Sequence, residues 1–130
     1  MDIKEKAIEY HEAGYNCAQS VLAACVDYTD MDEKTALAVS AGFGGGLRSG
    51  EICGAISGAV MAIGLTNPFN DSTDLAAKEK ISELAKCCVS AGKEKFGCTR
   101  CAELKGDKSN CGYYICEMAA IAEEIIKNNK

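Results

Sequence analysis

A stripe of residues without bulky side chains runs through the middle of the chain. It consists of Gly50, Gly54, Gly58 and Ala62, at intervals of four residues. On an α-helix such positions share one face, and the backbone of another helix can approach that face closely. Two glycines inside a helix cost about 1 kcal/mol each relative to alanine, so a packing gain should offset them. The stripe therefore predicts a central helix, from about Glu51 to Leu65, against which other helices pack.

The rest of the chain has the periodicity of amphipathic helices. Apolar residues recur at spacings of three and four, and residues that favour N-caps precede several of these segments. Further helices are expected to begin near Ile3, after Asn16, after Asp30 or Asp32, after Asp71 or Ser72, and after Asn110. Gly14 and Gly97 are expected to end two of them. No segment alternates as a strand would. The sequence predicts an all-α, single-domain bundle of about six helices over residues 1–130.

The composition limits the partners of this chain. Its net charge is −5 and its pI is about 4.9, which disfavours nucleic acid and anionic membranes. No apolar run approaches the roughly 18 residues of a membrane span. The N-terminal segment is charged and lacks an apolar secretory stretch, so a cytoplasmic location is expected.

Glycines from Gly42 to Gly50 predict a loop in front of Cys53. Gly45 and Gly50 have the spacing of a phosphate-binding loop, but Glu51 and Ile52 stand where lysine and serine or threonine are needed. The loop therefore does not predict a nucleotide site. We interpret it as a tight turn that delivers Cys53 to the start of the central helix.

Nine cysteines are the main chemical feature of the sequence. In a reducing compartment they indicate reactive or metal-binding thiols rather than a disulfide framework. Four of them would stand at predicted helix N-termini: Cys17, Cys53, Cys101 and Cys111. Unpaired N–H groups and the positive end of the helix dipole favour a thiolate there, so a thiol pKa below the usual value of about 8.5 is expected.

The other five cysteines give weaker signals. Cys25, Cys88 and Cys116 fall on apolar helical faces and are predicted to be core residues. Cys87 points away from Cys88 on the same helix, so these neighbours are not expected to pair. Cys98 forms a C-x-x-C with Cys101, which fits a thiol–disulfide switch or half of a zinc site.

Five segments of the chain together resemble a known family. They are GYNCAQSVL at 14–22, GFGGG at 42–46, CGAISGAVMAIGL at 53–65, KFG at 95–97 and CAELKG at 101–106. They resemble the bacterial and archaeal family of redox-active proteins that has four characteristic cysteines and a CGAxxG motif. The resemblance extends from about residue 5 to 125. It implies redox work at Cys17, Cys53, Cys101 and Cys111, with Cys116 as an alternative to the last.

Three classes of function remain open at this point. The first is redox chemistry, by dithiol–disulfide exchange or by electron transfer through an iron–sulfur cluster, with a redox protein as partner. The second is non-catalytic binding of zinc or copper(I), and the third is a helical interaction module. Haem is not expected, because the chain has one histidine and no C-x-x-C-H. The sequence leaves open the cofactor, whether the protein is an enzyme, and the oligomeric state, a homodimer included. A common redox centre predicts that at least three of the four sulfurs line one pocket.

Overall fold

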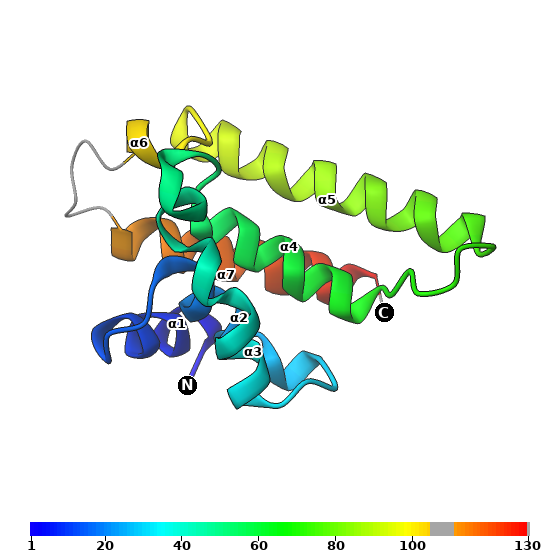
Figure 1. Cartoon of the computed structure of the whole chain (residues 1–130), viewed down its shortest axis with the longest axis horizontal. Helices are drawn as coiled ribbons and strands as arrows, with labels where there is room; N and C mark the ends of the chain where they lie inside the picture. The colour runs from blue at the N-terminus through cyan, green and yellow to red at the C-terminus, as the bar shows by residue number, and fades with distance from the viewer. Residues whose placement is uncertain (105–110, 130) are drawn as a thin grey trace.

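The computed structural model describes residues 1–104 and 111–129, and this part of the chain is all-α (Figure 1). Its α-helices are α1 (Ile3–Glu12), α2 (Cys17–Ala24), α3 (Glu33–Ser40), α4 (Gly54–Thr66), α5 (Leu75–Phe96), α6 (Cys101–Leu104) and α7 (Cys111–Asn128). The fold class predicted from the sequence is confirmed. Helix α6 is a single turn that follows α5. None of the described helices combines the length and the apolar character that crossing a membrane requires.

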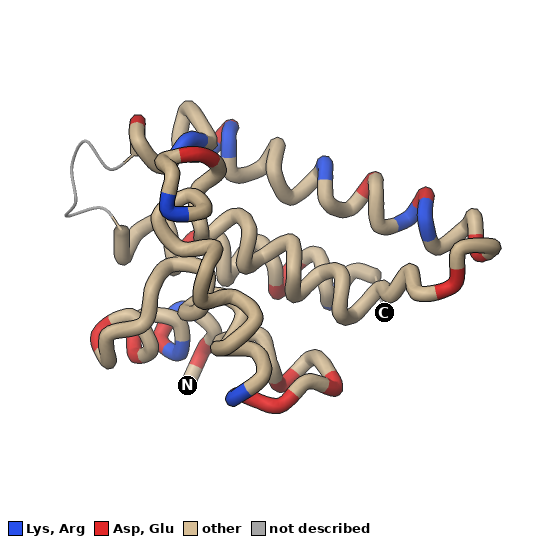
Figure 2. The backbone as a smooth tube through the Cα atoms, in the orientation of Figure 1, with Lys and Arg blue, Asp and Glu red and all other residues tan. Residues whose placement is uncertain are grey.

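Helix α4 lies at the centre of the bundle, as predicted. It packs against α2, α5 and α7 (Figure 1), and Ala55, Ile56, Ala59, Ala62 and Ile63 are fully buried. Figure 2 shows no charged residue on α2 or α4, whereas α1 and α5 carry many. Apolar residues of α2, α4 and α7 therefore form one core, and the charged helices cover it.

The glycine stripe makes the close contact between α2 and α4 that the sequence predicted. A methyl group at Gly58 would lie 2.6 Å from the carbonyl oxygen of Ala18, and one at Gly54 would lie 3.2 Å from the Ala18 nitrogen. The predicted start of this helix near Glu51 is wrong, and so is the place of Gly50 in the stripe. Residues 51–53 instead pair with residues 99–101 through an antiparallel bridge between Ile52 and Arg100.

Most of the predicted helix ends are confirmed. Gly14 (φ +113°) follows α1, and Gly97 (φ +85°) ends α5, both in backbone conformations that favour glycine. Asp32 caps α3. Helix α5 begins later than predicted because Asp74 is its cap, while Asp71 accepts hydrogen bonds from the backbone and hydroxyl of Thr73. The predicted cap at Asn110 lies outside the described residues.

Asn16 is expected to be the most consequential of these caps. Its side chain accepts the Gln19 N–H, the Gln19 side chain accepts the Asn16 N–H, and Asn16 Nδ2 donates to the Ala41 carbonyl at 2.9 Å. Asn16→Ala should lower the free energy of unfolding by about 2 kcal/mol, about half from the cap and half from the bond to Ala41. Urea titrations followed by circular dichroism measure this loss. Asp2→Ala, which removes one exposed cap bond, is the control; an equal loss in both variants would contradict the tie to Ala41.

Candidate thiol site

The four cysteines selected from the sequence all stand at helix starts. Cys17, Cys101 and Cys111 are the first residues of α2, α6 and α7, and Cys53 is the N-cap of α4. Cys17 is 6% exposed, and Cys53 and Cys101 are each 4% exposed. Cys111 is half-buried. The predicted placement is confirmed, and three of these thiols are shielded from solvent.

A short antiparallel contact brings Cys53 and Cys101 together. The Cys53 N–H donates to the Thr99 carbonyl at 2.7 Å, and the Cys101 N–H donates to the Glu51 carbonyl. Ile52 and Arg100, which face each other in the bridge, are exposed, whereas the flanking Cys53 and Cys101 are buried. Cys53 and Cys101 are diagonal neighbours across this contact. The Cα atoms of diagonal neighbours lie about 7–8 Å apart, and their Cβ atoms lie somewhat closer.

The glycine loop makes room for this contact. A methyl group at Gly46 would lie 2.8 Å from Cβ of Cys101 and 2.6 Å from the backbone of Glu51. Gly45, Gly46 and Gly50 all have positive φ angles, a conformation that glycine adopts at low cost. The glycines therefore let the loop turn tightly and pass directly against the two segments that carry Cys53 and Cys101.

Cys111 is a third thiol near this pair. Charges on Cys101 and Cys111 both disfavour a Cys53 thiolate, which places each of these two thiols within electrostatic range of Cys53. Burial is the main cause that raises the pKa of Cys53, although the N–H groups of Ala55 and Ile56 bond to its sulfur and lower it. The prediction of a lowered pKa is therefore wrong for Cys53, because loss of hydration outweighs the helix N-terminus.

Cys17 reaches the same region from α2. The Ala18 nitrogen packs against Gly54, so the residues that follow Cys17 and Cys53 are in contact. Both cysteines belong to the same buried apolar cluster. Two cavities among the described residues, one beside α1 and α2 and one along α5, have no cysteine in their lining. A pocket shared by three of the four sulfurs stays a prediction.

The described residues include no cluster of ligands already placed around a metal position. Among residues 1–104 and 111–129, no three Cys, His, Asp or Glu side chains lie close enough together to hold a metal ion. An iron–sulfur cluster or a structural zinc ion needs four such ligands. Metal binding by Cys17, Cys53, Cys101 and Cys111 therefore stays a prediction from the sequence.

The remaining cysteines divide into core and surface positions. Cys25 and Cys88 are fully buried, as predicted, and burial raises the pKa of each to about 12. Cys116 is only half-buried, and its thiol lies 3.8 Å from the Lys4 carbonyl on α1. Cys111 rather than Cys116 is thus the α7 cysteine whose charge acts on Cys53. Cys98 is half-buried, like Cys111 and Cys116, and Cys87 is exposed.

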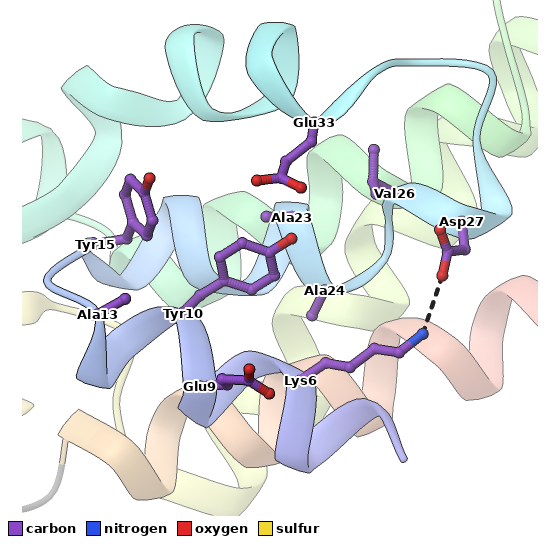
Figure 3. Close-up of a pocket in the computed structure, with 10 residues that line it drawn as sticks. All are labelled: Lys6, Glu9, Tyr10, Ala13, Tyr15, Ala23, Ala24, Val26, Asp27 and Glu33. Atoms are coloured by element: carbon purple, nitrogen blue, oxygen red, sulfur yellow. Dashed lines mark hydrogen bonds and ion pairs between the residues drawn. The ribbon is translucent and has the colours of Figure 1, made fainter. Parts of the chain in front are cut away.

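A cavity of about 360 Å³, which the sequence did not predict, lies between α1, α2 and the start of α3 (Figure 3). Its polar side chains are those of Lys6, Glu9, Tyr10, Tyr15, Asp27 and Glu33. Lys6 forms an ion pair with Asp27 at 3.0 Å, marked in Figure 3. The sequence does not predict this cavity, because charged residues on the outer face of an amphipathic helix are typical of an ordinary hydrated surface. No cysteine lines this cavity.

Comparison with protein families agrees with the sequence resemblance. The family model described as "Putative redox-active protein (C_GCAxxG_C_C)" matches residues 15–125. The chain belongs to this family. The match includes the four cysteines at helix starts and the segment from Cys53 to Gly58, in which cysteine precedes glycine, the reverse of the order printed in the family name. The family description supports a general redox role. No curated protein and no solved structure gives a significant match.

Proposed function

We propose that this protein performs thiol–disulfide redox chemistry with Cys53 and Cys101 as its dithiol. The supporting observation is the antiparallel contact between residues 51–53 and 99–101, in which both Cys53 and Cys101 are buried. Cys111 is the third thiol of the site, and Cys17 lies at the start of the neighbouring helix. A protein or small-molecule disulfide is the partner that this chemistry requires.

The reaction is a two-electron oxidation. The thiols of Cys53 and Cys101 together lose two protons and two electrons, and one S–S bond forms between them. The acceptor disulfide takes up these protons and electrons and is released as two thiols. A disulfide needs its Cα atoms within about 7 Å, and diagonal neighbours lie about 7–8 Å apart, so a small shift of the two segments would close the bond. Of these residues only Cys101, the first residue of the single turn α6, belongs to a helix, so this shift leaves the helical core in place.

The state of Cys53 fits a dithiol that is stable when reduced. Its pKa is raised by burial and by the neighbouring thiols, so at neutral pH the sulfur keeps its proton and avoids repulsion. A disulfide carries no charge and is tolerated in the same buried position. The thiolate is the attacking species, so oxidation should accelerate as the pH rises toward the raised pKa of Cys53.

Disulfide mapping tests the proposal. Reduced protein is treated with diamide, quenched by alkylation and digested without reductant. The major internal disulfide should join Cys53 to Cys101, and Cys53→Ser should abolish it. Cys25→Ala is the matched control, because this cysteine is buried in the core and away from the contact.

Two results would overturn the proposal. One is the absence of any internal disulfide of Cys53 or Cys101 while the exposed Cys87 becomes oxidised. The other is a stoichiometric metal in anaerobically purified protein that is lost in the Cys53→Ser and Cys101→Ser variants, which would assign the redox role to a bound metal.

A further inference from the structure

We propose that Cys98 is the entry thiol through which the buried Cys53–Cys101 dithiol exchanges disulfides with its partner. This inference rests on the proposed function. Cys53 and Cys101 are each 4% exposed, and a thiol must reach the sulfur that it attacks. A bulky disulfide therefore requires a more accessible cysteine next to the pair.

Cys98 is connected to both members of the pair. It precedes Thr99, whose carbonyl accepts the Cys53 N–H. It also stands three residues before Cys101, the first residue of α6, which is the C-x-x-C spacing of many dithiol centres. Gly97, with φ +85°, ends α5 and turns the chain toward this contact.

The neighbours of Cys98 hold its half-buried thiol in place. Its sulfur accepts the Arg100 N–H, and its thiol donates to the Glu103 carboxylate on α6. Burial and this carboxylate raise the pKa of Cys98, so its thiolate should form faster as the pH rises. Arg100 is itself held near Glu103 and Glu51, at 3.8 Å and 3.7 Å. These interactions tie the Cys98 thiol to the two segments that carry the buried pair.

The other accessible cysteines are placed less well for this role. Cys87 is on α5, and Cys116 lies against the Lys4 carbonyl on α1. Neither of them is near Cys53 or Cys101 along the chain or through a bridging hydrogen bond. Cys111 is half-buried and within electrostatic range of Cys53, so it is the competitor that an experiment must separate from Cys98.

The exchange proceeds in three balanced steps. The Cys98 thiolate attacks the partner disulfide, forms a mixed disulfide and releases the first partner thiol. Cys101 then attacks the Cys98 sulfur, forms the Cys98–Cys101 disulfide and releases the second partner thiol. Finally Cys53 attacks the Cys101 sulfur, forms Cys53–Cys101 and returns Cys98 to the thiol. The partner gains two electrons and two protons, and the protein loses them.

Oxidised glutathione is the probe for this route. Reduced full-length protein is mixed with it, quenched with acid at intervals and mapped by mass spectrometry. Cys98→Ser and Cys98→Ala should slow formation of the Cys53–Cys101 disulfide at least tenfold. Cys101→Ser should accumulate glutathione on Cys98. Cys87→Ser removes an exposed thiol outside the site and should react at the parent rate.

The outcomes separate this inference from the proposed function. Two results would show that Cys98 is not the entry thiol: formation of the Cys53–Cys101 disulfide in the Cys98 variants at the parent rate, or accumulation of glutathione on Cys111 in Cys101→Ser. Both results are compatible with Cys53 and Cys101 as the redox dithiol. If the parent forms no Cys53–Cys101 disulfide with either glutathione or diamide, the proposed function itself is wrong. Circular dichroism of each variant verifies that it is folded before the rates are compared.

Discussion

Gly58→Leu should be the most destabilising single substitution in α4, with a loss of about 3 kcal/mol or more in the free energy of unfolding. Even the first carbon of a side chain at this position would lie 2.6 Å from the Ala18 carbonyl oxygen and 3.2 Å from Cβ of Val21. The first of these atoms belongs to the backbone of α2 and cannot rotate away. Overpacking costs about 1–3 kcal/mol where side chains can adjust, so a contact with backbone should reach or exceed this range.

Alanine substitutions in the same helix provide the matched test. Gly58→Ala gains about 1 kcal/mol in helix propensity but makes the same backbone contact, so it should still destabilise. At Gly64 a methyl group would meet only Cδ1 of Ile81, at 4.0 Å, so Gly64→Ala should stabilise by up to about 1 kcal/mol. Urea unfolding followed by circular dichroism measures both. Effects of the same sign would show that the α2–α4 contact is looser than described.

The fold could be predicted from the sequence because local signals agreed with one another. Asn16, Asp32 and Gly97 each act within a few residues of their own position, and all three end or begin a helix as expected. The glycine stripe predicted a contact between distant segments, because only another backbone explains a helix face without side chains. The predicted start of α4 failed because a nonlocal contact, Ile52 with Arg100, competes for the residues before Cys53.

The site was predictable in part for the same reason. The helix-start positions of Cys17, Cys53 and Cys101 follow from local caps and turns. The contact between the segments of Cys53 and Cys101 depends on the bridge between Ile52 and Arg100, and no periodicity in either segment predicts that bridge. The pKa of Cys53 could not be predicted from its helix position, because burial is a property of the whole fold and here exceeds the local effect.

The buried pair Cys25 and Cys88 should make the protein sensitive to alkaline pH. Both are fully buried, and burial is the main cause that raises the pKa of each to about 12. In the unfolded chain these thiols should ionise near pH 8.5. Between these values the folded state binds more protons than the unfolded state, so the free energy of unfolding falls as the pH rises.

The expected loss is large and can be assigned to these two residues. Each thiol contributes up to about 1.4 kcal/mol per pH unit, so the pair should cost up to about 5 kcal/mol between pH 8 and pH 10.5. Chemical denaturation at a series of pH values, with a non-thiol reductant present, measures this slope.

The Cys25→Ala/Cys88→Ala variant should be less stable at pH 7 because of the lost volume, yet its stability should fall less steeply with pH. Cys87→Ala removes a neighbouring exposed thiol and should keep the parent slope. Equal slopes in the parent and the double variant would contradict the prediction, because ionisation of other groups would then control the alkaline loss.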